Sequence, residues 1–343
     1  MNLDFFKQLL SFDSTSGKER EVAIWLYETL SAPSKELMEV GDGTLNLFLK
    51  WGEPKLVFCT HMDTVPPYIP PTFTEDAVLG RGSCDAKGQI LALYSACKEL
   101  EARGKDGFGL LLLAGEETGS WGAKAFAKTP FRAPYLVVGE PTENKMVSAA
   151  KGTQSYQLRF SGKAFHSGYP EHGASAVDAF VEFYNKLKAT DFGPDPELGE
   201  TTWNIGKLCS DNPQNILSPE LTCRLYFRTT FVSDEAVVKY MEGVAEGQKG
   251  IVTAGLRGRI SVTARGGDAP QRYVVPEGFE SAPVAFGSDA PHLSNFGHKL
   301  ICGPGSIRHA HRPDEQISLP ELEEAVKLYV RLFKHLYSLR ASV

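Results

Sequence analysis

Histidine and acidic residues follow the ends of four short apolar segments, and these are residue types that bind metal ions in hydrolytic sites. The pairs, apolar segment first, are 55–59 with His61 and Asp63, 108–114 with Glu116 and Glu117, 135–138 with Glu140, and 299–302 with His309 and His311. Short unbroken apolar segments are typical of strands buried on both faces of a parallel sheet. Because ligands bind beyond the carboxyl ends of such strands, we expect these side chains to meet at one edge of a sheet.

A hydrolytic metal centre needs neutral imidazoles, carboxylates and a nearby proton acceptor. His61 supplies an imidazole at a strand end, and Asp63 is placed to fix its tautomer through the other ring nitrogen. Asp85 opens a glycine-flanked loop before a helix, where a carboxylate can bridge two metal ions about 3.5–4 Å apart. The three residues together favour a two-metal site.

In two pairs of nearby residues, both members could take the same role. On an extended segment Glu116 and Glu117 send their side chains apart, so one can bind metal while the other acts as general base. His309 and His311 share a face if their segment is extended, and spacing alone leaves both open. Each residue taken singly has a commoner structural role. Their recurrence at strand ends carries the prediction, because unpaired acids at one edge repel unless cations hold them together.

The elements that position these residues follow two patterns. Residues 3–31 are predicted to be helical with a break at 14–17, where Ser14 or Ser16 could cap the second helix. A strand–helix alternation, including a helix over 87–103, then continues to about Lys151 and returns after 284, ending in a helix over 320–339. This alternation predicts an α/β domain with a mostly parallel sheet flanked by helices.

The middle of the chain has a different rhythm. Strands over 153–161, 201–209, 220–230 and 258–264 enclose helices over 175–188 and 233–246. Strand-helix-strand-strand-helix-strand is the ferredoxin-like order. We therefore predict a catalytic domain formed by residues 1–152 and 269–343, with an inserted α+β lid or dimerisation domain at 153–268.

Five motifs together resemble one hydrolase family. They are Thr60-His-Met-Asp-Thr-Val-Pro66, Gly80-Arg-Gly-Ser-Cys-Asp-Ala-Lys-Gly88, Ala114-Gly-Glu-Glu-Thr-Gly119, Gly139-Glu-Pro-Thr142 and Ala310-His-Arg-Pro-Asp-Glu315. Their order over nearly the whole chain resembles the zinc aminoacylase and carboxypeptidase family. That family contains acetylornithine deacetylase, succinyl-diaminopimelate desuccinylase and glutamate carboxypeptidase. The segments 303–307 and 310–315 look most like acetylornithine deacetylase.

The resemblance implies two Zn²⁺ per subunit, with Co²⁺ as a substitute, and a role for each residue. His61 and Glu140 would bind one zinc, Glu117 and His311 the other, and Asp85 would bridge them. Glu116 would be the general base and Asp63 the residue that orients His61. The family motif selects His311 over His309.

The inserted domain also resembles its counterpart in the family. His166, in Ala164-Phe-His-Ser-Gly168, would reach the active site of a partner subunit and stabilise the oxyanion, which implies a homodimer through this domain. Asn215 and Arg228 would bind substrate, the arginine through a carboxylate, and Arg224 competes because it shares the strand face. Gly287 and Ser288 would lie near the substrate. Tyr226 departs from the family, which often has an acid there.

The resemblance implies a binuclear zinc amide hydrolase that removes an N-acyl group from an amino acid. N-acetylornithine, in arginine biosynthesis, is the first expectation. N-acetylcitrulline, N-succinylornithine and N-acetyl-lysine, or the substrates of a dipeptidase or carboxypeptidase of the same family, are alternatives. A catalytically dead scaffold is disfavoured, because no expected ligand is missing.

The overall composition excludes other classes of partner. The formal net charge of −6 over 343 residues gives no electrostatic reason to expect nucleic acid or an anionic membrane. No apolar stretch approaches the roughly 20 residues of a membrane helix, and the start lacks the apolar core of a signal peptide. Six cysteines without framework spacing are typical of thiols in a reducing compartment. We therefore expect a cytoplasmic enzyme acting on a small molecule.

Overall fold

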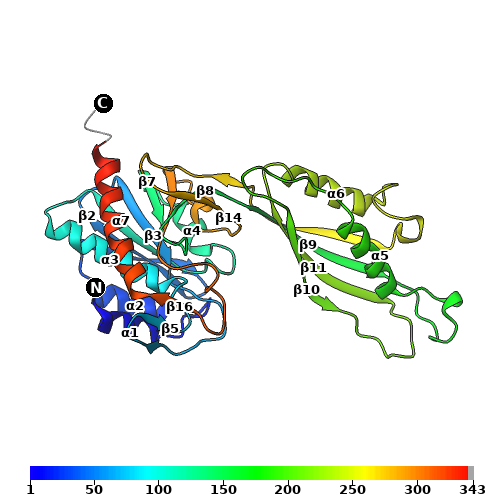
Figure 1. The fold of residues 1–343 in the computed structure, drawn as a ribbon. Coiled ribbons are helices and arrows are strands. Elements are labelled where there is room, and N and C mark those ends of the chain that lie inside the picture. Colours follow the sequence, from blue (N-terminus) through cyan, green and yellow to red (C-terminus); the bar gives the residue numbers. More distant parts are fainter. Residues whose placement is uncertain (339–343) are drawn as a thin grey trace. The chain divides into compact units, whose positions relative to one another are not determined.

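The computed structural model describes residues 1–338, which fold into two compact units (Figure 1). The first unit contains Met1–Ser148, Tyr273–Ala282 and the described residues from Ser288 on, and the second contains Ala149–Arg272 and Pro283–Gly287. The sequence assigned residues 149–152, 269–272 and 283–287 to the catalytic domain, but all three segments belong to the second unit. The Lys151 N–H donates to the Val284 carbonyl, a contact within that unit. Leu339, predicted as the end of the last helix, lies outside the described residues.

A six-stranded sheet forms the centre of the first unit. In order across the sheet its strands are β1 (Ser34–Gly41), β2 (Thr44–Trp51), β6 (Phe108–Leu113), β3 (Leu56–His61), β7 (Ala133–Val138) and β15 (Phe296–Ile301). β3 runs parallel to β6 and β7, and β7 runs parallel to β15, whereas β1 and β2 are antiparallel. All residues of β3 and β6 are buried, as their unbroken apolar sequences predict. The four apolar segments therefore lie side by side and point the same way.

Helices cover both faces of this sheet. They are α1 (Leu3–Leu10), α2 (Arg20–Thr29), α3 (Lys87–Ala102), α4 (Trp121–Phe126) and α7 (Leu319–Ser338). α1, α2, α3 and α7 share one apolar core with alternate strand residues such as Phe58 and Leu110. On the other face Phe48 of β2 packs against Phe126 of α4, with ring centroids 5.5 Å apart. None of the described helices has the length and apolar character needed to cross a membrane.

Two three-stranded sheets form from segments outside the central sheet. β5 (Ala77–Leu79) pairs antiparallel with β4 (Thr72–Phe73) and with β16 (Gln316–Ser318). β8 (Met146–Ala150) lies between β13 (Gln271–Arg272) and β14 (Ser281–Val284). Short 3₁₀ helices form at Pro170–His172, Ala254–Leu256 and Ala290–His292. The pairing of β5 with β16 brings the segment before Asp85 beside the segment after His311.

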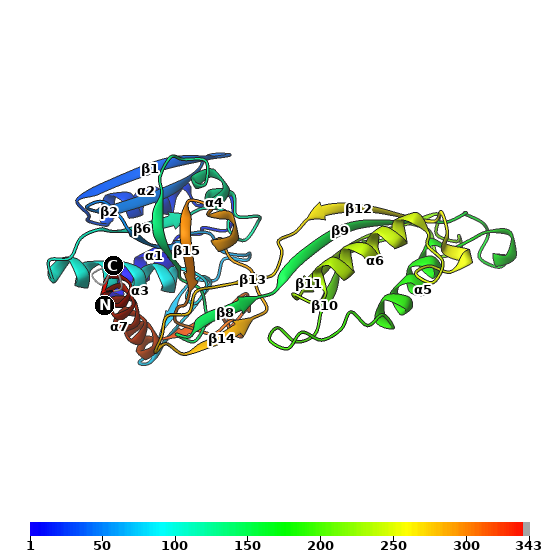
Figure 2. The same ribbon diagram turned by 90° about the horizontal axis from the view of Figure 1, so that it is seen from above.

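The second unit is a four-stranded antiparallel sheet with two helices on one face (Figure 2). Its elements are β9 (Gly152–Ser161), α5 (Ala176–Lys188), β10 (Thr202–Cys209), β11 (Glu220–Thr229), α6 (Asp234–Glu246) and β12 (Ile260–Gly266). The strand order β10-β11-β9-β12 is that of a ferredoxin-like sheet. The predicted fold class is confirmed for both units.

The predicted serine caps of α2 are wrong. The residue before α2 is Glu19, and no side chain caps that helix. The Ser14 hydroxyl instead donates to the carbonyl of Met62, and the Ser16 hydroxyl donates to the carboxylate of Asp63. These hydroxyl groups bond to residues distant in the sequence, because the loop 11–19 packs beside the end of β3.

Candidate metal centre

The parallel strands deliver the predicted ligands to one edge of the sheet. His61 is the last residue of β3 and lies opposite Leu113, the last residue of β6. Glu116 and Glu117 follow β6 in a turn, and Glu140 follows β7. The two glutamates are therefore part of a turn, and not of the extended segment considered in the sequence analysis.

Asp85 lies between two histidines. Its Oδ1 is 3.1 Å from Nε2 of His61, and its Oδ2 is 3.2 Å from Nε2 of His311. Nε2 of His311 is also 2.8 Å from Oε1 of Glu117. Ligand atoms of His61, Asp85 and Glu117 all lie within 4.8 Å of one another. Offering one oxygen to each side is what a bridging carboxylate does.

Glu140 completes the set of predicted ligands. Its side chain is buried, and its Oε1 has no hydrogen-bond partner among the described residues. A buried carboxylate oxygen without a partner is costly unless a cation or proton neutralises it. The donors are carboxylates and imidazoles, which suit Zn²⁺. The residues present therefore fit two metal ions.

Two carboxyl groups at this cluster, those of Glu116 and Glu140, have raised pKa values. Burial raises the pKa of Glu116 well above its usual range, and Asp289 and Glu140 add to the effect while His61 opposes it. Burial likewise raises the pKa of Glu140, with a further contribution from Asp85. A buried cation would lower each of these pKa values, because it favours the charged form.

The pKa values of the two histidines are also raised, whereas the pKa of Asp85 is lowered. Burial alone would lower the pKa of His61, but hydrogen bonds to Asp63 and Asp85 raise that pKa well above its usual value. Hydrogen bonds to Asp85 and Glu117 raise the pKa of His311 to about 10. Burial disfavours ionised Asp85, yet the two histidines hold its pKa far below the usual range. Without cations, protons on the histidines balance the carboxylates.

Asp63 has a wider role than the predicted orientation of His61. Nδ1 of His61 is 3.0 Å from the backbone oxygen of Asp63 and 3.3 Å from its Oδ1. The Asp63 carboxylate also accepts the N–H groups of Glu116 at 3.0 Å and Glu117 at 3.1 Å. Nearby, the buried Glu19 accepts the Gly115 N–H at 3.0 Å. Two buried carboxylates therefore fix the turn that carries the glutamate pair.

His311, and not His309, contacts the cluster. Both lie in a turn, so they do not share a strand face. His311 adopts a φ of 63°, which turns its backbone away from the path of an extended segment. His309 Nδ1 is buried without a hydrogen-bond partner among the described residues.

Two buried carboxylates near the site were not among the predicted site residues. Asp289 is 1% exposed, and burial raises its pKa to about 6. Glu315 is fully buried and accepts backbone N–H groups from the turn that carries Asp85. Glu315 is the last residue of the fifth motif, and Asp289 directly follows the predicted Gly287 and Ser288, so their positions beside predicted site residues were the available signal.

In the second unit the predicted His166 and Asn215 lie together. Ser167 N–H donates to the Asn215 carbonyl at 2.9 Å, and His166 pairs with Ile216 in an isolated bridge. Both predicted residues are exposed. The Gly168 N–H donates to Nδ1 of His166 at 3.1 Å, which leaves the proton of a neutral ring on Nε2.

Buried and half-buried residues alternate along β11, and Arg224 and Arg228 are on its half-buried face. The Arg228 guanidinium stacks over the Tyr226 ring, 5.0 Å from its centroid. Nε of Arg224 donates to the Gln157 side chain at 3.4 Å. Tyr226, the departure from the family pattern, thus supports one of the two arginines.

Gly287 and Ser288 differ in exposure. Gly287 is exposed and belongs to the second unit, whereas Ser288 is buried and belongs to the first. The Ala290 N–H donates to the Ser288 hydroxyl at 3.3 Å. Neither residue contacts the cluster of His61 and Asp85 through a hydrogen bond that the structure shows.

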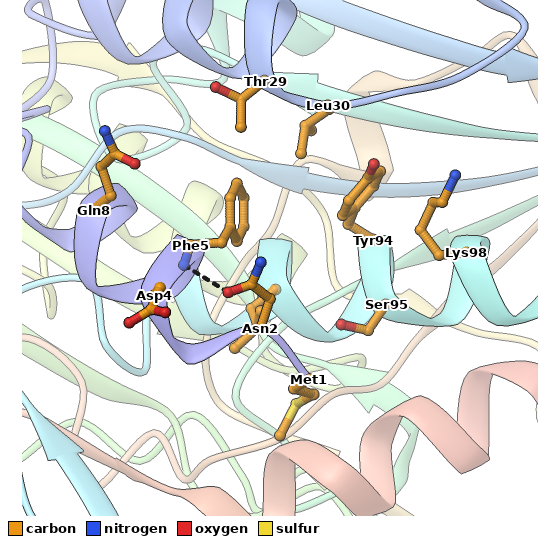
Figure 3. A pocket seen from close by; sticks show the side chains of 11 residues that line it. Met1, Asn2, Asp4, Phe5, Gln8, Thr29, Leu30, Tyr94, Ser95 and Lys98 are labelled. Carbon is orange, nitrogen blue, oxygen red and sulfur yellow. Dashed lines mark hydrogen bonds between the residues drawn. The ribbon is translucent and has the colours of Figure 1, made fainter.

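A pocket of about 600 Å³ elsewhere in the first unit contains none of the predicted site residues (Figure 3). It is formed by α1, the end of α2 and α3, with Phe5, Leu30 and Tyr94 on its wall. Its polar groups, which include Asp4 and Lys98, do not form a ligand set of the kind found at the strand ends.

The fold and the donor set are those of a metallohydrolase, and comparisons identify the family. The model of peptidase family M20/M25/M40 matches residues 57–335. A peptidase M20 domain-containing protein of Schizosaccharomyces pombe is 32% identical over 98% of this chain and 85% of its own length. A probable carboxypeptidase of Aspergillus niger is 30% identical over 97% and 89%. The crystal structure of a Staphylococcus aureus tripeptidase, 20% identical, superposes with a TM-score of 0.80 over 96% of this chain and 95% of that chain.

The chain belongs to peptidase family M20/M25/M40. It is accordingly a hydrolase of peptide or related amide bonds. The comparisons do not single out acetylornithine deacetylase among the members of this family.

Proposed function

We propose that this protein hydrolyses the amide bond that joins an acyl group to an amino acid with a free α-carboxylate, using two metal ions. Asp85, flanked by His61 and His311 with Glu117 beside them, carries the proposal. His61 and Glu140 would hold one zinc ion, Glu117 and His311 the other, and Asp85 would bridge them. Two such cations would act as Lewis acids on the scissile carbonyl. Co²⁺ is expected to substitute.

Glu116 acts as the general base. It takes a proton from the attacking water and returns that proton to the nitrogen of the leaving amino acid. Burial supports this role, because it raises the pKa of Glu116 and so opposes the lowering by the cations; a base that must also act as an acid needs a pKa nearer neutrality than an exposed glutamate has. The hydrogen bond from the backbone N–H of Glu116 to the Asp63 carboxylate holds the residue in place.

His166 stabilises the oxyanion. Because Nδ1 accepts the Gly168 N–H, the neutral ring presents Nε2–H as a donor, and an exposed donor can reach a developing negative charge. Arg228 binds the substrate α-carboxylate, and Asn215 hydrogen-bonds the substrate beside His166. Stacking on Tyr226 supports this use of Arg228, since it orients the guanidinium while leaving its N–H groups available.

Two substrate classes share this chemistry. N-acetylornithine is proposed from the motifs, and its use would place the enzyme in arginine biosynthesis. Release of a C-terminal residue from a short peptide is the second candidate, favoured by the 30% identity to a probable carboxypeptidase. Both substrates have the form acyl–NH–CHR–COO⁻.

A substrate panel tests the choice. The metal-loaded protein is assayed with N-acetylornithine, N-acetylcitrulline, N-succinylornithine, N-acetyl-lysine and dipeptides with free and blocked carboxyl termini. A higher kcat/KM for the acetylated amino acids than for the dipeptides supports a deacetylase. A higher kcat/KM for the dipeptides supports a peptidase. Turnover of substrates with blocked carboxyl groups at the same rate would contradict the proposal for Arg228.

We further propose a homodimer formed through the second unit. This unit exposes large apolar side chains, which are costly to leave in water over a wide area: Phe165, Val177, Val181, Leu208 and Ile216. Val177 and Val181 are four residues apart and share a face of α5. The variant V181D should dissociate the dimer in analytical ultracentrifugation, and a wild-type chain that sediments as a monomer would contradict the proposal.

Mixing two inactive variants tests whether His166 serves the partner subunit. In a mixed dimer of E116Q and H166A, the chain that keeps Glu116 receives His166 from its partner, so activity returns. If each chain uses its own His166, mixing restores nothing.

A further inference from the structure

Glu315 connects the two loops that carry Asp85 and His311. It lies four residues after His311, directly before β16, and is fully buried. Its backbone carbonyl accepts the Gly80 N–H at 2.8 Å, which extends the pairing of β16 with β5. The residue therefore belongs to the His311 loop while its side chain points into the Asp85 turn.

Each carboxylate oxygen of Glu315 has its own set of donors. Oε1 accepts backbone N–H groups from Gly82 at 3.0 Å, Cys84 at 3.1 Å and Asp85 at 3.1 Å. Oε2 accepts from the buried Arg81 guanidinium, which also donates to the carbonyl of residue 312 at 3.2 Å. Charge-assisted bonds of this kind are stronger than neutral ones. The Glu315 side chain therefore fixes the backbone of the turn from Gly82 to Asp85.

We propose that Glu315 is a positioning residue that holds Asp85 in the orientation needed to bridge two metal ions, through the three N–H groups on its Oε1. The inference rests on the proposed two-metal function. Glu315 does not bind metal itself, because its oxygens are already used by Arg81 and the turn. Residues that orient metal ligands commonly change metal affinity by about 10–100-fold when replaced.

The ion pair and the N–H contacts can be separated by two double variants. E315Q/R81M removes both charges but keeps one side-chain oxygen to accept the N–H groups of the turn. E315L/R81M removes both charges and the acceptor as well. Replacing both partners of a buried ion pair avoids leaving one charge unpaired, so both variants are expected to fold. D314N is the control for charge loss in the same loop, since Asp314 is exposed and pairs with Arg312.

Metal affinity and the Co²⁺ absorption spectrum are the measurements. A chelator competition with Zn²⁺ should show E315Q/R81M within a few-fold of wild type and E315L/R81M weaker by about 10–100-fold. The d–d bands of the Co²⁺ protein should shift in E315L/R81M and stay unchanged in D314N. Circular dichroism and thermal melting establish that each variant is folded.

If E315L/R81M does not fold, E315D replaces it. The shorter side chain keeps the charge opposite Arg81 but withdraws from the turn, and it should lower zinc affinity in a folded protein. Equal zinc affinity and unchanged Co²⁺ bands in the folded acceptor-free variant, or in E315D, would overturn the proposal. A wild-type chain that binds two metal ions but hydrolyses no amide would contradict only the proposed function, whereas one that binds no metal would overturn both.

Discussion

The predicted residues of the two units differ in how much the fold holds them. In the first unit His61, Asp63 and Asp85 are buried in a hydrogen-bonded network, and the turn with Glu116 is fixed by backbone contacts. In the second unit His166 and Asn215 are exposed, on loops that pair with each other. The candidate metal centre is thus arranged before any ligand binds, whereas the second unit presents exposed donors, for which we propose that substrate and a partner subunit supply the remaining contacts. Preorganised groups contribute to catalysis without reorganisation, so the two regions should respond differently to mutation.

The largest effect is expected from Glu116→Gln. Loss of the general base should lower kcat by about 10²–10⁴-fold, while zinc content stays that of wild type. Steady-state kinetics and elemental analysis of the same samples measure both. Glu143→Gln, an exposed glutamate, is the control and should retain activity. A Glu116→Gln variant within a few-fold of wild-type kcat would remove the proposed mechanism.

A smaller effect is expected from His166→Ala. Removing one oxyanion donor costs about 10²–10³-fold in kcat, and because His166 is exposed the melting temperature should not change. His172→Ala, on an exposed histidine of the same segment, should have little effect. Loss of stability in His166→Ala would show that this region is as tightly built as the metal centre, contrary to the comparison.

The two arginines of β11 sharpen the comparison further. Arg228→Ala should raise KM, with a loss of about 10–100-fold in kcat/KM, the size of a lost hydrogen bond to a charged group. Arg224→Ala should lose much less, because Gln157 already holds that side chain. Kinetics with substrates that carry or lack the α-carboxylate measure the difference. The reverse order of the two variants would assign the carboxylate to Arg224.

The smallest effect concerns the stability of the metal-free protein and its dependence on pH. Burial raises the pKa of Asp289 from 3.8 to about 6, so its contribution to stability is present below pH 4 and is lost as the pH rises to 6. Hydrogen bonds to Asp85 and Glu117 raise the pKa of His311 from 6.5 to about 10. The contribution of His311 to stability is therefore present below pH 6.5 and is lost as the pH rises to about 10.

Denaturant unfolding after chelation should therefore give a free energy of unfolding that falls as the pH rises above 4. Zinc at about 100 times its Kd should restore about 2.7 kcal/mol for each site that it fills. If the metal-free protein instead became more stable between pH 4 and 6, the assigned balance of charge at the centre would be wrong.

Sequence reasoning predicted that His61, Asp85, Glu117 and His311 come together, because the signal was local. An apolar strand followed by an acid or histidine is visible in the sequence, and parallel strands bring those ends together. It could not choose between His309 and His311 from spacing, because the φ of 63° at His311 depends on the surrounding loops. It did not identify Glu315, because that role arises from a contact with residues more than two hundred positions away.

The cap prediction failed for the same reason. Ser16 lies where a helix cap is typical, but its hydroxyl donates to Asp63, 47 positions along the chain. Local propensity cannot foresee a stronger tertiary acceptor. In the second unit the strand and helix pattern was sufficient for the fold, whereas the roles of Asn215 and Arg228 came only from family resemblance and stay predictions.

The most direct test of the two-metal centre is the number of metal ions that the chain holds. After dialysis against Zn²⁺ and removal of free metal, elemental analysis should give about two zinc ions per wild-type chain, because the bridging carboxylate and its flanking ligands form two adjacent positions. Glu140→Gln should reduce the number to about one, since Glu140 is proposed to serve a single metal ion. A wild-type chain that holds no zinc, or a double variant His61→Ala/His311→Ala that holds as much zinc as wild type, would contradict the account.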